Sequence, residues 1–157
     1  MKNNLFNSGK YYDLFYKDKD YESEAKSIHK KLIENHVKGR NILELGCGTG
    51  KHAISFSELG YKILGIEQSQ SMIDSAIEVE NFRCIQGDIR TIKLQEKFDS
   101  VISLFHVISY QITNQSLLSV FKTANDYLNK NGIFLFDVWY TPAVLHQKPT
   151  VKIKKIK

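Results

Sequence analysis

The chain has 157 residues, of which 42% are hydrophobic and 25% are charged, as expected for a single globular domain that buries a core. Its net charge of +5 comes from residues 148–157, whose five lysines leave 17 of the 22 basic residues to balance the 17 acidic ones. Because the charges of residues 1–147 cancel, the sequence gives no reason to expect a nucleic-acid partner. The sequence has no long apolar run and no apolar leader, which argues against a membrane span and predicts a cytoplasmic protein.

Residues 1–40 are expected to form a helical cap on the domain. Residues 5–16 hold five aromatic side chains among polar ones, and apolar side chains then recur at the spacing of one helix face. This periodicity predicts a helix over about 21–37 that is ended by Gly39.

A mostly apolar run over 41–45 is typical of a buried strand, and the turn 46–50 that follows has glycine at every second position. Glycine has no Cβ, so the backbone can take a positive φ and a bound molecule can approach it closely. A helix predicted over 51–59 would point its free N–H groups at such a molecule. The turn is therefore a candidate ligand site, and the alternative is a tight turn without a ligand.

Strands and helices alternate through residues 41–140, which predicts one α/β core with a doubly wound, mostly parallel sheet. Such a sheet places its ligand at the carboxyl ends of the strands, where the strand order reverses. After the glycine turn, the expected elements are a strand over 62–66, a helix opened by Ser69 and reaching Val79, a strand over 82–86, a strand over 98–105, a helix over 114–130 capped by Asn131 and Gly132, and a strand over 133–138.

Glu67 follows the second predicted strand, 21 positions after Gly46. A carboxylate at this place in an α/β nucleoside site accepts hydrogen bonds from both ribose hydroxyls, because its two oxygens can accept two bonds at once. The alternative is a solvated acid at a strand end.

The two cysteines, Cys47 and Cys84, are too few for a disulfide framework. They have no accompanying ligand spacing, so no metal site is predicted. We expect both to be small, partly buried fillers.

The glycine turn resembles motif I of the class I S-adenosylmethionine-dependent methyltransferases, written E/D-x-G-x-G-x-G. Glu44, Gly46, Gly48 and Gly50 match it without departure, whereas the dinucleotide fingerprint G-x-G-x-x-G has its third glycine one position later. The resemblance implies a Rossmann-like fold with S-adenosylmethionine as cofactor. It also implies that Glu44 faces the ammonium of the methionine moiety, whereas an acid there would repel a pyrophosphate.

The same resemblance assigns further positions to the cofactor. Tyr12 would close over it from the N-terminal cap, and Met72 would pack against the adenine. Asp88 would accept from the adenine amino group, while the Ile89 N–H meets a ring nitrogen. The plainer alternatives are core packing for Tyr12 and Met72 and an Asx turn for Asp88. The remaining assigned residues are Cys47, Gln68 and Leu104.

The methyl acceptor is expected to be a small molecule. Enzymes that methylate nucleic-acid bases carry an N/D/S-P-P-Y/F/W motif after the fourth strand, and this sequence has no proline before Pro142. The residues Leu104-Phe105-His106 instead resemble small-molecule N- and O-methyltransferases, with His106 or Tyr110 facing the acceptor. His106 could act as a general base, or it could be a pocket or structural residue, since transfer to an amine needs mainly positioning.

The tail, residues 141–157, is shorter than the family fold requires. That fold adds two strands after the fifth, and Val151, Ile153 and Ile156 could make at most one lysine-rich edge strand. We therefore expect a fold truncated after strand five, either as a fragment or as a chain that relies on a partner, such as a second copy in a homodimer.

The function that this resemblance implies is transfer of a methyl group from S-adenosylmethionine to a small molecule. The Y-D-L, L-G-C-G-T-G-K-H, G-I-E-Q-S and F-D-V-W segments are most similar to N-methyltransferases of nucleotide-linked amino sugars. Two alternatives remain: a non-catalytic S-adenosylmethionine-binding domain or truncated product that needs a partner, and a nucleotide-dependent oxidoreductase with the same α/β pattern.

Overall fold

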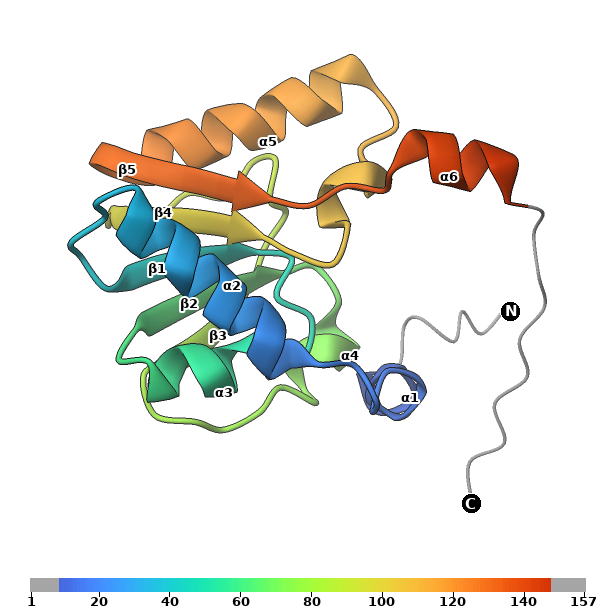
Figure 1. Ribbon diagram of the computed structural model, residues 1–157, viewed down its shortest axis with the longest axis horizontal. Coiled ribbons are helices and arrows are strands. Elements are labelled where there is room, and N and C mark those ends of the chain that lie inside the picture. The colour runs from blue at the N-terminus through green and yellow to red at the C-terminus, as the bar shows by residue number, and fades with distance from the viewer. Residues whose placement is uncertain (1–8, 148–157) are drawn as a thin grey trace.

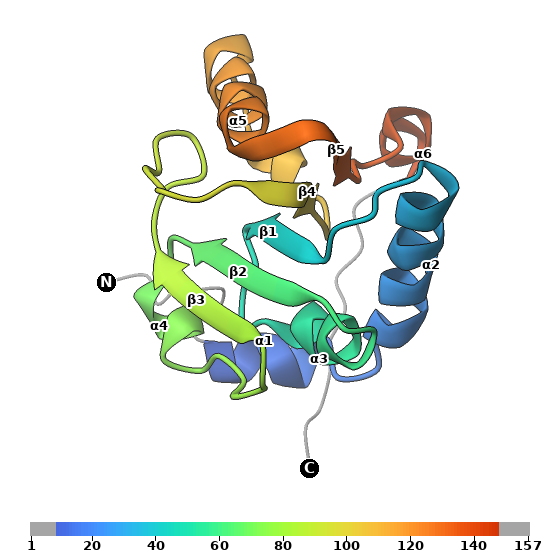
Figure 2. The same cartoon turned by 90° about the vertical axis from the view of Figure 1, so that its left-hand side faces the viewer.

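Five strands form one parallel sheet in the order β3-β2-β1-β4-β5, with helices on both faces (Figure 1, Figure 2). The computed structural model describes residues 9–147. The doubly wound parallel sheet predicted from the sequence is confirmed. Its strands are β1 (Asn41–Leu45), β2 (Lys62–Glu67), β3 (Phe82–Gln86), β4 (Phe98–Ser103) and β5 (Leu128–Phe136). The helices are α1 (Gly9–Phe15), α2 (Tyr21–Glu34), α3 (Lys51–Glu58), α4 (Gln70–Ile73), α5 (Asn114–Tyr127) and α6 (Thr141–His146), with a 3₁₀ helix at Val107–Tyr110.

Alternating strand side chains pack into two apolar cores, one on each face of the sheet. Ile42 of β1 joins α2 and α3 in the first core, where Phe56 is fully buried. The next residue, Leu43, faces the second core, which α5 covers through Val120 and Ala124. This alternation follows from the pleat of the strands, and burial of both faces is typical of parallel sheets.

The strand order reverses between β1 and β4. The chain runs from β1 outward through β2 to β3, then crosses back to add β4 and β5 on the other side. In sheets of this kind, the ligand lies beyond the carboxyl ends of the strands at the reversal. The glycine turn after β1 lies at this reversal, as predicted.

The helix predicted over 21–37 ends earlier, at Glu34, and Gly39 does not end it. His36 takes the left-handed conformation with φ 60°, and the Val37 N–H closes the end on the Leu32 carbonyl at 3.0 Å. Gly39 has another role, because a Cβ there would lie 1.9 Å from the Asp99 carboxyl carbon. The terminating residue is thus a left-handed histidine instead of the glycine that usually occupies such a position.

The predicted cap at Asn131 and Gly132 is also wrong, since α5 ends at Tyr127 and β5 starts at once. Asn131 has φ 66° and lies where the β4–β5 register shifts. An Asn-Gly pair is typical of a helix end, but here it lies within the edge strand β5 at the shift in its pairing with β4. Such bulges are common at sheet edges.

The helix predicted from Ser69 to Val79 is a single turn, α4, that stops at Ile73. Beyond it, the Ile77 N–H donates to the Thr49 carbonyl at 3.0 Å. This bond ties the segment to the glycine turn, so its backbone supports the ligand site instead of continuing a helix.

The β5 edge carries exposed apolar side chains. Phe136, Val138 and Trp139 are each 42–51% exposed, and α6 adds Leu145 at 79%. Within residues 9–147, β5 pairs only with β4. The edge strand predicted around Ile153 lies outside the described residues. No helix in the described part of the chain is long and apolar enough to cross a membrane.

Candidate functional site

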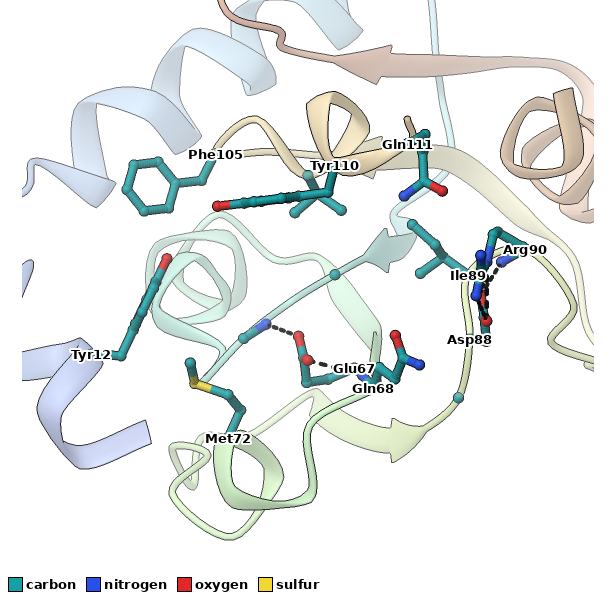
Figure 3. A pocket seen from close by; sticks show the side chains of 14 residues that line it. Tyr12, Glu67, Gln68, Met72, Asp88, Ile89, Arg90, Phe105, Tyr110 and Gln111 are labelled. Carbon is teal, nitrogen blue, oxygen red and sulfur yellow. Dashed lines mark hydrogen bonds and ion pairs between the residues drawn. The ribbon is translucent and has the colours of Figure 1, made fainter. Parts of the chain in front are cut away.

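A cavity of about 660 Å³ lies at the carboxyl ends of the strands, within the range of small-molecule sites (Figure 3). Tyr12 and Met72 stand at one end of it, Asp88 and Arg90 at the other, and Glu67 between them (Figure 3). The predicted site residues on its wall are Tyr12, Gly46, Gly48, Glu67, Gln68, Met72, Asp88, Ile89 and Tyr110. Residues on its wall to which the sequence analysis gave no role are Gly87, Arg90, Phe105, Val107 and Gln111.

A second cavity of about 40 Å³ lies between the glycine turn and the N-terminal cap. Cys47 and Leu104 line this one together with Tyr12 and His52. The other predicted site residues, Glu44, Gly50 and His106, line neither of the two cavities.

The glycine turn is held in a conformation that only glycine adopts easily. Gly46, Gly48 and Gly50 have φ of 79°, 57° and 79°. A Cβ on Gly46 would lie 2.6 Å from Val107, and one on Gly50 would lie 2.5 Å from the Phe82 ring. A Cβ on Gly48 would meet no atom of residues 9–147 within 4 Å. Gly46 and Gly50 are therefore required by packing, whereas Gly48 leaves open space at the cavity wall.

Glu67 braces the glycine turn with its carboxylate. Its Oε2 accepts from the Gly48 N–H at 2.9 Å, and its Oε1 accepts from the Gln68 N–H at 2.9 Å (Figure 3). The same Oε1 also accepts from the Ser69 N–H at 2.9 Å. A carboxylate has about four acceptor positions, so room is left for one further donor while these three bonds persist. The sequence suggested a ribose acceptor and did not reveal this bracing role.

Asp88 is engaged by Arg90 at the far end of the cavity. Asp88 Oδ1 accepts from the Arg90 backbone N–H at 2.9 Å and from Nε at 2.8 Å, and Oδ2 pairs with Nη2. These hydrogen bonds lower the pKa of the Asp88 carboxyl. The Asx turn left open by the sequence is present, and the Asp-x-Arg spacing was the signal for the ion pair.

The two cysteines are neighbours in the structure. Cys47 is buried, Cys84 is half-buried, and their Sγ atoms lie 3.3 Å apart as free thiols. The hydrogen bond with Cys84 and burial raise the pKa of the Cys47 thiol. Gly65 makes room for the pair, since a Cβ there would lie 2.4 Å from Cys47 Sγ.

The N-terminal cap is fastened to the glycine turn through Asp13. Asp13 Oδ1 accepts from Thr49 Oγ1 at 2.6 Å, and Oδ2 lies 3.2 Å from Lys51 Nζ. This places Tyr12 over the turn, where its ring packs edge-on to Phe105 at a centroid distance of 6.2 Å. Burial raises the pKa of Tyr12 well above its ordinary value, so the phenol stays neutral.

His52 is the buried centre of a charged cluster that the sequence analysis missed. Its Nε2 lies 2.8 Å from Glu24 Oε2, and its Nδ1 lies 3.2 Å from Glu44 Oε1. Burial alone lowers the pKa of His52, but the hydrogen bonds to Glu24 and Glu44 outweigh it and raise the pKa to about 9. In return, the hydrogen bond from His52 lowers the pKa of the Glu24 carboxyl to about 2.

We expect this cluster to make stability depend on pH. A His52 pKa raised from 6.5 to about 9 gives stability that is fully present below pH 6.5 and is lost as pH rises through 9. A Glu24 pKa lowered from 4.5 to about 2 gives stability that is present above pH 4.5 and is lost as pH falls toward 2. The other groups facing the imidazole are Glu44, Lys19 and the Tyr21 ring.

The measurement is the free energy of unfolding in urea at pH 5.5, 7 and 9.5. His52→Gln should destabilise the protein most at pH 5.5 and least at pH 9.5. The matched control is His29→Gln, because that imidazole meets the Tyr61 hydroxyl at 2.9 Å and forms no ion pair with a carboxylate of residues 9–147. A constant difference between wild type and His52→Gln at all three pH values would contradict the charged cluster.

On the acceptor side, the structure separates the two predicted catalytic residues. Tyr110 lines the main cavity and is 66% exposed. The His106 N–H donates to Asp137 Oδ1 at 2.8 Å, its Nδ1 lies 3.2 Å from Asp137 Oδ2, and its ring packs on Trp139. His106 follows Phe105 with both residues at φ near 60°, a strained pair of the kind found at functional sites.

This fold and this cavity define an α/β nucleoside-binding domain with its site at the strand-order reversal. The methyltransferase domain family matches residues 42–132. The chain belongs to that family, and the resemblance drawn from the glycine turn is confirmed.

Comparison with individual proteins agrees. The chain is 30% identical over 134 residues to a dTDP-3-amino-3,4,6-trideoxy-alpha-D-glucopyranose N,N-dimethyltransferase of Streptomyces venezuelae, covering 83% of this chain and 56% of the relative. It is 33% identical over 132 residues to a putative methyltransferase of Bacillus subtilis, covering 81% and 52%. A solved sugar N-methyltransferase from Streptoalloteichus superposes with a TM-score of 0.77 at 28% identity, covering 84% of this chain and 55% of that one. The chain thus spans about half the length of the relatives it matches.

Proposed function

We propose that the chain binds S-adenosylmethionine in the 660 Å³ cavity and serves methyl transfer to a small molecule. The observation that carries the proposal is that the glycine turn, Glu67 and Met72 meet at one cavity in a chain of the methyltransferase domain family. The residues fit this cofactor. Gly48 leaves open space, Glu67 keeps acceptor capacity for a ribose hydroxyl, and Glu44 Oε2 is a buried carboxylate oxygen without a partner within residues 9–147.

S-adenosylmethionine would supply a methyl group bonded to a positively charged sulfur; an acceptor amine would attack that methyl carbon in line while the C–S bond breaks and the thioether S-adenosylhomocysteine leaves. The chain contributes orientation and exclusion of water. Tyr12 and Phe105 cover the cavity from the cap and from the β4 loop, and the exposed Tyr110 borders its open side. Holding a neutral amine in line with the methyl group supplies most of the acceleration, so no strong base is needed. His106, braced by Asp137, would serve as general base only if its ring turned toward the cavity.

For the acceptor, we propose the amine of a nucleotide-linked sugar. The support is the similarity to dTDP-amino-sugar N,N-dimethyltransferases and to a solved sugar N-methyltransferase. In this proposal, residues 1–40 are a cap on the cofactor-binding core 41–140, and residues 141–157 begin a further region.

One observation favours a second candidate, a cofactor-binding domain that acts only with a partner or a second copy. Apolar side chains gather beyond β5 with little cover from residues 9–147, among them Trp139 and Leu145. Methyl transfer by this chain alone would exclude the second candidate.

The test is isothermal titration with S-adenosylhomocysteine and, separately, with NAD. We expect saturable binding of S-adenosylhomocysteine and none of NAD. Binding of NAD alone would replace the proposal with an oxidoreductase. Addition of a dTDP-amino sugar with S-adenosylmethionine then tests the acceptor, with the methylated amine detected by mass spectrometry.

A further inference from the structure

The buried imidazole of His52 joins three parts of the fold beside the glycine turn. His52 comes from the first turn of α3, Glu24 from α2 in the N-terminal cap, and Glu44 from β1 directly before the turn. The His52 side chain is only 6% exposed and Glu44 only 2%. The cluster therefore connects the cap to the glycine turn through a buried imidazole and a buried carboxylate, and its cap-side member, Glu24, is 44% exposed.

His52 can satisfy both carboxylates only in its charged form. A neutral imidazole carries one N–H, so it could donate to Glu24 or to Glu44 but not to both. The two short distances, 2.8 Å and 3.2 Å, require a donor at each ring nitrogen. A pKa of about 9 agrees with an imidazolium at neutral pH. Lys19, which pairs with Glu24, adds a second positive charge on the cap side.

The cluster leaves one acceptor unused. Glu44 Oε1 faces His52, whereas Glu44 Oε2 is buried and has no hydrogen-bond partner within residues 9–147. A buried carboxylate oxygen without a donor is costly, so such an atom marks a place where a donor is expected. Glu44 stands on β1 two residues before Gly46, and Gly46, Cys47 and His52 line the 40 Å³ cavity.

We infer that His52 is a positioning residue that fixes the Glu44 carboxylate, so that its free oxygen receives the amino group of the amino-acid part of S-adenosylmethionine. This inference rests on the proposed function. Through Glu24, the same imidazole also links closure of the cap to this amino-group site. An aliphatic ammonium suits the site, because it brings N–H donors and a positive charge to a buried acid.

The experiment compares two ligands that share a nucleoside and a thioether. S-adenosylhomocysteine carries the amino-acid group and 5′-methylthioadenosine lacks it. His52→Gln can donate to only one carboxylate, so we expect it to weaken S-adenosylhomocysteine about tenfold or more and to leave 5′-methylthioadenosine within about twofold. Glu24→Gln, at a side chain that is 44% exposed, should show the same ligand preference with a smaller loss.

A double variant at Glu44 and His52 distinguishes a positioning role of His52 from a general loss of structure. In a Glu44→Ala background, His52→Gln should cause no further loss of S-adenosylhomocysteine, because the carboxylate that it positions is gone. Equal weakening of both ligands, or additive losses in the double variant, would overturn the inference. So would an unchanged ratio of the two affinities in His52→Gln. If the wild-type chain binds neither ligand, the proposed function itself fails, which is a different result.

Discussion

Replacing Gly48 with alanine is expected to remove most of the cofactor affinity while the protein still folds. The new methyl group would meet no atom of the described residues within 4 Å, because Gly48 faces open space at the wall of both cavities. That space is the volume that the proposed ligand needs. Overfilling a close-packed contact costs roughly 1 to 3 kcal/mol, which corresponds to about a 5- to 150-fold loss of affinity. Titration with S-adenosylhomocysteine measures it.

The matched control is Gly60→Ala, at the end of α3 and away from both cavities. Gly60 has φ 79° and, like Gly48, open space around a Cβ. Both substitutions put alanine in the left-handed region and should each cost roughly 1 to 2 kcal/mol of folding stability. If both variants lose the same folding stability but only Gly48→Ala loses ligand affinity, the ligand lies over Gly48. If folded Gly48→Ala protein bound S-adenosylhomocysteine as tightly as the wild type, the glycine turn would not be part of the cofactor site.

Local sequence pattern predicted the frame of the site well. The alternation of strands and helices fixes the sheet, and a parallel sheet brings the ends of β1, β2 and β3 to one edge. The sequence could therefore place the glycine turn and Glu67 together at this edge. Each of these signals lies within one strand and its following turn, which is the range over which sequence periodicity is informative.

The features that were missed depend on contacts between distant segments. His52 carries no signal on its own helix, and its importance comes from Glu24, 28 positions earlier, and from Glu44 on another element. The early end of α4 likewise follows from the bond of Ile77 to Thr49 and from no local stop signal. The pairing of His106 with Asp137 spans 31 positions. Tertiary hydrogen bonds of this kind outweigh local preferences.

Glu67→Ala is expected to weaken binding of the nucleoside by roughly 1 to 3 kcal/mol, or about 5- to 150-fold. The carboxylate accepts from three backbone N–H groups, including that of Gly48. The substitution therefore removes both the ribose acceptor and the brace of the glycine turn. Glu67→Gln keeps one carbonyl acceptor and replaces the other with a donor that repels the Gly48 N–H, so an intermediate loss is expected.

A ligand lacking one hydroxyl separates these two effects. With one acceptor position left on Glu67, the wild type should lose affinity for the 2′-deoxy or the 3′-deoxy form of 5′-methylthioadenosine, but not equally for both. In Glu67→Ala, removal of the same hydroxyl should cost nothing further, because its partner is gone. If the variant still discriminates between the deoxy ligand and its parent, Glu67 only braces the turn and another group binds the ribose. Equal losses for both deoxy ligands in the wild type would mean that Glu67 releases one backbone N–H when the ligand binds.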